Sequence, residues 1–193
     1  MLSALMLRHH PIERLESLSS ELFQTRFVER EIPVVISGAI EHWPARAHWT
    51  VAGLRDRIGT KPTRFKVSGT HRHPDFGADG SAQMFATETA TFAEFLEKLA
   101  GPDAHRYLLT GEEEWLFKRR RGQADRHTEK LQELLDDFIP PPLFAAKQAY
   151  STWFWLSGRG VRTWLHYDNN GCHNLNALVQ GSKQVSLFPP EAL

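Results

Sequence analysis

Residues 155–168 read WLSGRGVRTWLHYD and decide both the fold class and the chemistry that this sequence predicts. Two glycines place a turn ahead of a short extended run that contains His166 and Asp168. Side chains two positions apart on a strand leave the same face, so these two can reach one metal ion. Imidazole and carboxylate are the ligands of open iron sites built from two histidines and one acid. The stretch therefore predicts a strand that carries two metal ligands.

Residues 172–190 continue as CHNLNALVQGSKQVSLFPP. The runs 175–179 and 184–188 are rich in apolar residues and flank Gly181, which predicts two further strands joined by a turn. A lone His-x-Asp triplet is weak evidence, because Asp168 in a surface turn can instead cap a neighbouring amide. The sequence around the triplet therefore has to decide between a metal site and a turn.

The upstream sequence predicts both helices and strands. Apolar residues at helical spacing favour a first helix from Ile12 to near Arg30. The other expected elements are helices over 50–58, 91–99 and 131–138, strands over 33–36, 64–67, 107–110 and 152–156, and a loop over 69–82. Helices followed by closely spaced strands indicate one α+β domain over residues 1–193, with a helix-and-strand region over 1–145 and the metal-binding strands over 146–193.

The composition excludes several classes of protein. Basic and acidic residues number 23 each, so no net field draws the chain to nucleic acid or to an anionic membrane. The basic run Lys118–Arg121 lies near the acidic run Glu112–Glu114, which favours a solvated face over a nucleic-acid site. No apolar run approaches the roughly 20 residues of a membrane span. Cys172 is the single cysteine, which excludes a disulfide framework within the chain and favours a cytoplasmic location.

Both quoted segments closely resemble the first metal-binding strands of the jumonji C and cupin-like oxygenases. Residues 33–39 (PVVISGA) with 42–44 (HWP) are similar to the entry strand of that family. The resemblance implies a double-stranded β-helix, or jelly roll, with helices before it. It also implies Fe(II), 2-oxoglutarate as co-substrate, and hydroxylation of a protein side chain or a small molecule. His166 and Asp168 match the first two iron ligands of the family.

The same resemblance implies roles for four further residues. Thr163 and Lys183 match the groups that bind the distal carboxylate of 2-oxoglutarate, and Tyr107 matches a tyrosine that donates to the same carboxylate. Asn174 matches an asparagine near the iron-bound end of the co-substrate. These types suit a dianion in a dry site, which needs a cation and neutral donors to offset its desolvation. Without the resemblance, Lys183 is an ordinary turn lysine and Tyr107 a core tyrosine.

The second histidine ligand of the family has no counterpart in the printed sequence. His173 is the only histidine after Asp168, and on a strand it points away from the face of Asn174. The alternative to an oxygenase is therefore a catalytically inactive cupin-like binding or scaffold module, or a fragment of a longer oxygenase. A product that ends at Leu193 is expected to dimerise or aggregate through unpaired sheet edges.

Overall fold

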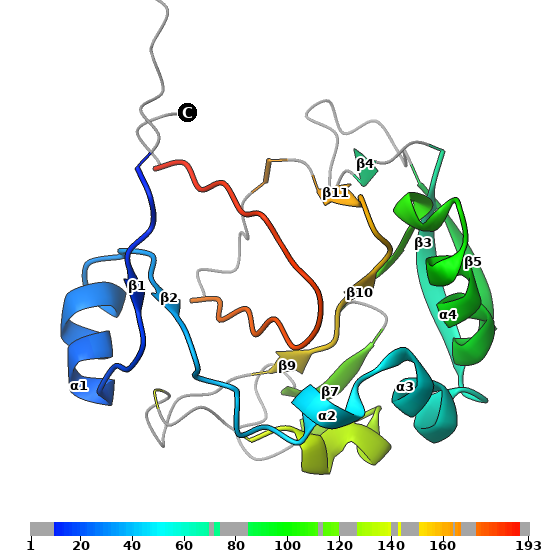
Figure 1. The fold of residues 1–193 in the computed structure, drawn as a ribbon, viewed down its shortest axis with the longest axis horizontal. Helices are drawn as coiled ribbons and strands as arrows, with labels where there is room; N and C mark the ends of the chain where they lie inside the picture. The colour runs from blue at the N-terminus through cyan, green and yellow to red at the C-terminus, as the bar shows by residue number, and fades with distance from the viewer. Residues whose placement is uncertain are drawn as a thin grey trace, which may run out of the picture. The chain divides into compact units, whose positions relative to one another are not determined.

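The computed structural model of the chain describes residues 10–69, 72–73, 85–111, 114–119, 127–139, 143, 151–163, 165–166 and 173–189. The chain divides into two compact units, residues 1–42 with 140–148 and residues 43–139 with 149–193. Figure 1 shows helices and strands in both. Within the described ranges, none of the helices has the length and apolar character that a membrane crossing needs.

The described part of the first unit contains a short parallel strand pair and one helical segment. β1 (Arg14–Leu15) pairs with β2 (Val35–Ile36). α1 (Ser20–Leu22) begins where the Ser19 side chain accepts from the Leu22 amide, and it continues as a π-helix, η1 (Phe23–Val28). The prediction of one helix from Ile12 onward is wrong at its start, because residues 14–15 join a strand ladder and Ser19 is the N-cap.

A four-stranded antiparallel sheet of order β10-β6-β3-β5 organises the second unit. Its members are β3 (Pro62–Ser68), β5 (Phe85–Thr91), β6 (Tyr107–Leu109) and β10 (Leu156–Ser157). β3 and β5 pair over seven residues each, from Pro62 opposite Thr91 to Ser68 opposite Phe85. The strands expected near 64–67 and 107–110 are confirmed, whereas β5 was not predicted.

Three helices accompany this sheet: α2 (Ala45–His48), α3 (Val51–Ile58) and α4 (Phe92–Ala100). α3 begins at Thr50, whose side chain accepts from the Gly53 amide. α4 begins with a capping box, in which Thr91 accepts from the Glu94 amide and the Glu94 carboxylate accepts from Thr91. Both helices were predicted, because an N-cap followed by apolar residues at helical spacing is a local signal.

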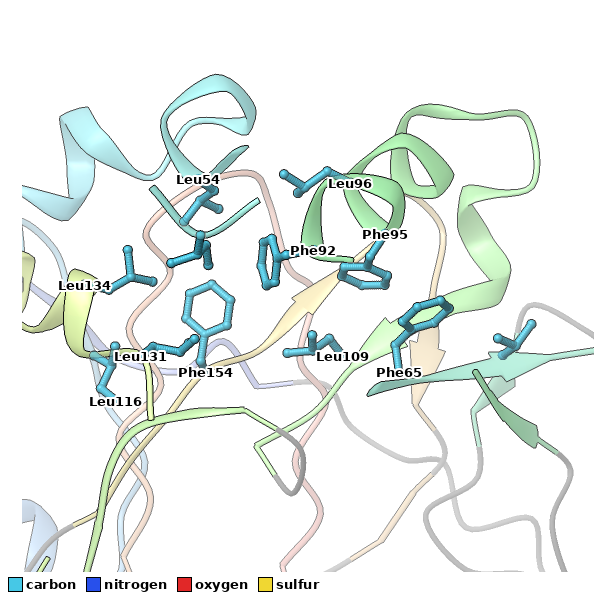
Figure 2. Packing of buried hydrophobic residues seen from close by; sticks show 12 residues of the cluster. Leu54, Phe65, Phe92, Phe95, Leu96, Leu109, Leu116, Leu131, Leu134 and Phe154 are labelled. Atoms are coloured by element: carbon cyan, nitrogen blue, oxygen red, sulfur yellow. The ribbon is translucent and has the colours of Figure 1, made fainter. Parts of the chain in front are cut away.

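The core lies where α3 and α4 meet the sheet (Figure 2). Phe65 of β3 packs on Phe95 of α4 with ring centroids 4.7 Å apart, and Phe92 packs edge-on to Phe95 at 6.0 Å. All three rings are fully buried. Removing a buried Phe side chain typically costs about 3–5 kcal/mol, so these rings hold the helices on the sheet. The other buried members of the cluster are Leu54, Ile58, Val67, Leu96, Leu109, Leu116, Leu131, Leu134 and Phe154.

A second sheet of order β8-β7-β9 consists of β7 (Trp115–Arg119), β8 (His127–Glu129) and β9 (Thr152–Trp153). Beside it, the helix expected over 131–138 is a 3-10 helix, η3 (Gln132–Asp137). Leu131 and Leu134 are both buried, and a spacing of three residues aligns side chains on one side of a 3-10 helix. A shorter 3-10 helix, η2 (Ala104–Arg106), precedes β6.

The C-terminal segment, residues 173–189, has no regular secondary structure, so the strands predicted over 175–179 and 184–188 are wrong. A strand exists only when its amides and carbonyls pair with a neighbour, and no described residue forms a ladder with this segment. Its apolar side chains are accordingly exposed, Leu178 at 43%, Val185 at 55% and Leu187 at 58%. Figure 1 draws the segment in orange to red without arrows.

Candidate metal and co-substrate site

The proposed metal-binding segment follows β11 (Arg162–Thr163), which pairs in parallel with β4 (Arg72–His73). Thr163 lies opposite His73 in this ladder and is exposed. His166 follows three residues later and is also exposed. Asp168 lies outside the described residues, so its expected position beside His166 stays a prediction. Across the ranges that are described, no group of three or more His, Cys, Asp or Glu side chains gathers closely enough to hold a metal.

The backbone that leads to this segment is fixed at Gly158. The Gly158 amide donates to the Tyr107 carbonyl at 3.2 Å, next to the pair formed by Ser157 and Leu108. A Cβ atom at position 158 would lie 1.9 Å from the Ala104 carbonyl oxygen, so only glycine fits at this approach. Gly160 then adopts φ +85°, a conformation that glycine adopts without strain. The predicted turn is therefore present and is held against η2 and β6.

Tyr107 occupies the first position of β6 and is half-buried. Its ring centroid lies 6.1 Å from that of Phe65 in an edge-on arrangement. The Lys98 ammonium of α4 lies 5.2 Å from the centre of the same ring. Both neighbours fix the ring, which is the packing expected of a core tyrosine, and the proposed role at the co-substrate stays a prediction.

Lys183 and Asn174 both lie in the C-terminal segment and are exposed. Gly181 has φ +86°, so the backbone turns two residues before Lys183, as the sequence predicted. Just before this turn, the Arg46 guanidinium donates to the Val179 carbonyl at 2.5 Å, and the Gln180 side-chain amide donates through Nε2 to the Arg46 carbonyl at 2.9 Å. Sequence reasoning missed Arg46, because no local pattern connects positions 133 residues apart.

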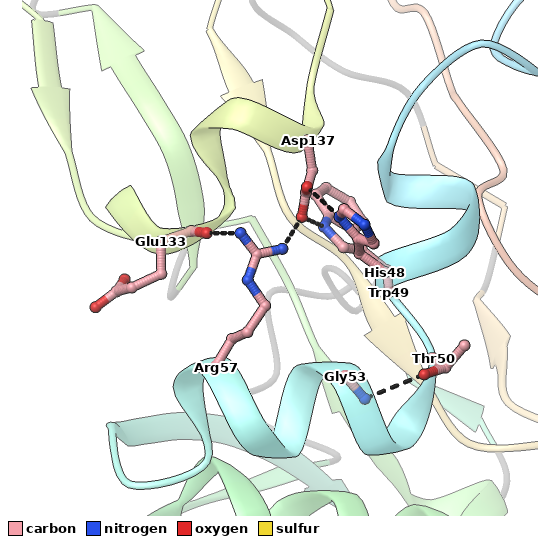
Figure 3. A network of polar contacts seen from close by, with 7 residues as sticks. All are labelled: His48, Trp49, Thr50, Gly53, Arg57, Glu133 and Asp137. Carbon is pink, nitrogen blue, oxygen red and sulfur yellow. Dashed lines mark hydrogen bonds and ion pairs between the residues drawn. The ribbon is translucent and has the colours of Figure 1, made fainter.

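Sequence reasoning also missed a buried acid, Asp137, at the end of η3 (Figure 3). Its carboxylate accepts from His48 Nδ1 at 2.7 Å, from Trp49 Nε1 at 2.8 Å and from the Arg57 guanidinium. Burial raises the pKa of Asp137, but the hydrogen bonds from these three donors outweigh it and hold the pKa below its ordinary value. Asp137 is therefore held in its charged, carboxylate form, and its three hydrogen bonds connect the end of η3 to α2 and α3.

A shallow cavity of about 400 Å³ adjoins this network. Its walls come from α2 and α3 and contain none of the residues predicted for the metal or the co-substrate. The lining residues are Ala47, His48, Thr50, Gly53, Asp56 and Arg57.

Comparison with known proteins identifies the family. The cupin-like domain family matches residues 19–193. The human tRNA wybutosine-synthesizing protein 5 is 28% identical over 188 residues, which cover 95% of this chain and 57% of that protein. The zebrafish (Danio rerio) protein of the same name is 31% identical over 153 residues, covering 77% and 44%. The lysine-specific demethylase JMJ30 of Arabidopsis thaliana is 28% identical over 187 residues, covering 92% and 37%.

The chain spans about half the length of the curated relatives it matches. The family match includes both segments that resembled the jumonji C and cupin-like oxygenases, and the expected α+β class is confirmed by the antiparallel sheet and its helices. The chain belongs to the cupin-like family of jumonji C type.

Proposed function

We propose that this protein is an Fe(II)- and 2-oxoglutarate-dependent oxygenase that hydroxylates a C–H bond of its substrate. One observation carries the proposal: the family match over residues 19–193 contains the His166-x-Asp168 pair and, fifteen positions after Asp168, Lys183. The relatives are jumonji C-type proteins that include demethylases, which supports an oxidative reaction. The inactive scaffold module is not favoured by these relatives.

The donor set suits iron. His166 supplies an imidazole and Asp168 a carboxylate, the ligand types of open non-haem iron sites. The His166 side chain is exposed, and the position of Asp168 beside it is part of the proposal. When bound, iron and 2-oxoglutarate would supply the oxidising chemistry, and the protein would hold and orient these groups. The role of His166 and Asp168 is to hold the metal with positions left open for co-substrate and oxygen.

The co-substrate is assigned to four side chains. We propose that the Lys183 ammonium and the Thr163 hydroxyl bind the distal carboxylate of 2-oxoglutarate, because an ammonium and a neutral donor together offset the desolvation of a dianion. Tyr107 is proposed as a further donor to that carboxylate. Its ring is already held by Phe65 and Lys98, so its hydroxyl would lose little freedom on binding. Asn174 is proposed to lie near the iron-bound end.

The substrate is proposed to be a protein side chain. The relatives include tRNA wybutosine-synthesizing proteins and lysine- and arginine-specific demethylases. Their names suggest two substrate classes for this protein, tRNA and protein. Binding to a phosphate backbone draws on Lys and Arg, and the 23 basic residues of this chain are balanced by 23 acidic ones, which favours a protein substrate over tRNA. A small molecule remains the second candidate. We also propose a cytoplasmic location, on the single cysteine.

The test measures bound iron and 2-oxoglutarate-dependent succinate release in the purified full-length protein. His166→Ala and Asp168→Ala are each expected to lower iron affinity by more than the roughly 10- to 100-fold that loss of an outer-shell partner costs. Both should abolish succinate release. His42→Ala, which removes an exposed histidine elsewhere, is the matched control and should change neither.

Two results would decide against the proposal. Iron binding and succinate release that survive in His166→Ala would reject the site, and their absence from the wild-type protein would favour a scaffold module. Adding a peptide mixture or unmodified tRNA to the same assay tests the substrate class. Stimulation by tRNA alone would replace protein as the proposed substrate.

A further inference from the structure

Two reciprocal hydrogen bonds join α2 to the turn that precedes Lys183. The Arg46 guanidinium donates to the carbonyl of Val179, and the Gln180 side-chain amide donates to the carbonyl of Arg46. The second bond has a clear origin, because the last four carbonyls of a helix have no partner within it. α2 has four residues, so the Arg46 carbonyl is one of these, and Gln180 satisfies it. Arg46 thus contacts the turn through its side chain and its backbone together.

The helix that carries Arg46 is firmly attached to the core on both sides of that residue. Trp43 and Ala45 are buried, and the Trp43 ring packs edge-on against Phe138 at 4.9 Å. On the other side, His48 and Trp49 both donate to the buried carboxylate of Asp137. Arg46 therefore projects from a fixed support.

The turn itself has no comparable support from a sheet. Residues 173–189 join no strand ladder with the described part of the chain, and their side chains are exposed or only half-buried. Gly181 adopts φ +86°, and a Cβ atom there would meet no other atom within 4 Å, so its role is conformational. Contacts from α2 thus fix the chain immediately before Gly181 and three residues before Lys183.

We infer that Arg46 and Gln180 are positioning residues, which hold the turn from α2 so that Lys183 is presented to the distal carboxylate of 2-oxoglutarate. This inference rests on the proposed function of Lys183. An ammonium binds a carboxylate as a point charge on a flexible stem, so the position of its backbone decides how much freedom the contact costs. Without the two bonds, the segment must be ordered at the moment of binding, and the affinity for 2-oxoglutarate falls.

The experiment compares hydrogen exchange of the segment with 2-oxoglutarate affinity in the full-length protein. Amide exchange over residues 173–189 is followed by mass spectrometry without co-substrate, and the dissociation constant of 2-oxoglutarate is measured by calorimetry. Arg46→Ala and Gln180→Ala are each expected to speed exchange and to weaken binding roughly two- to tenfold, the ratio that one modest hydrogen bond supports. Arg46→Lys keeps a donor for the Val179 carbonyl and should recover part of both effects.

Two further variants separate the inference from the function on which it rests. Arg55→Ala removes an exposed arginine of α3, paired only loosely with Glu97 at 3.6 Å, and should change neither quantity. Lys183→Ala should weaken 2-oxoglutarate binding while leaving exchange unchanged, because its contact is with the co-substrate. Unchanged affinity in Lys183→Ala would reject its proposed role, and this inference with it.

Three outcomes would overturn the inference and leave the function of Lys183 intact. The first is exchange over 173–189 that stays the same in both Arg46→Ala and Gln180→Ala. The second is faster exchange with unchanged 2-oxoglutarate affinity, when Lys183→Ala does weaken binding. An equal loss of affinity in Arg55→Ala would point to general charge and would also reject positioning.

Discussion

The sheet that carries α3 and α4 and the C-terminal segment 173–189 both contain large apolar side chains, but these lie in opposite surroundings. In the first region, strands pair with one another and aromatic rings from β3 and α4 interlock with no exposure. In the second, Val185 and Leu187 are more than half exposed, and the contacts with α2 are polar. Apolar side chains stabilise a protein only when another surface removes them from water. The stability of the described fold therefore comes from the first region.

The largest expected difference between the two regions is in the free energy of unfolding. Phe95→Ala should lower it by about 3–5 kcal/mol, because the ring is fully buried between Phe65 and Phe92. Leu187→Ala should change it by less than about 0.5 kcal/mol. Urea denaturation followed by tryptophan fluorescence measures both. Similar losses in the two variants would show that residue 187 is buried in solution.

A smaller loss in the free energy of unfolding is expected at Asp137, whose buried contacts are polar. Asp137→Asn weakens three hydrogen bonds to a buried carboxylate and should cost about 1.5–3 kcal/mol at neutral pH. Because the folded pKa lies below the ordinary value of 3.8, this contribution is complete above that value and is lost as the pH falls through the folded pKa. The stability difference between wild type and variant should therefore be constant from neutral pH down to about 5 and shrink below about 4.

Unfolding free energies of both proteins measured across that range provide the check. The matched control is Asp56→Asn, an exposed acid of α3. A wild-type advantage that grows as the pH falls would contradict the assignment of a carboxylate held in its charged form.

A comparable or smaller loss of stability is expected from alanine substitutions at Gly158, which follows β10, and at Gly181 in the C-terminal segment. Gly158→Ala places a Cβ atom against the Ala104 carbonyl, and the backbone shift that relieves it should cost about 1–3 kcal/mol. Gly181→Ala meets no atom and suffers only from its positive φ, so about 1 kcal/mol is expected. Thermal unfolding of both variants and of the wild-type protein measures these losses of stability. A harmless Gly158→Ala would mean that β10 does not dock on β6 as described.

The smallest effect on stability is expected when a charged residue is introduced into the exposed segment 173–189. The same change should have a separate effect on self-association. Leu187→Lys should leave the unfolding free energy within about 0.5 kcal/mol of wild type. Exposed apolar side chains favour association, in addition to the predicted pairing of sheet edges, so the variant should shift the protein toward monomer in light scattering at equal concentration. A wild-type protein that is already monomeric at high concentration would reject dimerisation.

The elements that the sequence predicts well are those with signals inside the element. Thr91 with Glu94 forms a capping box directly before apolar residues at helical spacing, and α4 begins there. By contrast, β5 reads FATETAT, with one large apolar residue, and it is a strand because β3 pairs with it along its whole length. The strand predictions over 175–179 and 184–188 were wrong for the opposite reason. These residues have the composition of strands, but no described neighbour pairs with them.

The candidate site shows the same division. The His-x-Asp spacing, the turn glycines and the lysine that follows are local patterns, and they led to the family that comparison confirms. Asp137 was missed because its three donors lie 80 to 89 residues away in the sequence, so nothing near it indicates its role. Arg46 was missed for the same reason. Side-chain geometry between distant elements depends on the packed fold and leaves no local signal.

The central strand β6 is only three residues long and pairs on both sides, with β3 before it in the sequence and with β10 after it. Leu109 pairs with Leu156, so 156 − 109 = 47 residues must be synthesised before that edge can close. At roughly 5–20 residues per second, the ribosome takes about 2–9 s to supply them. During this interval β3, β5 and α4 can already pack on the nascent strand. An edge of three residues offers few hydrogen bonds to a neighbouring nascent chain, so its brevity limits mispairing while it waits for β10.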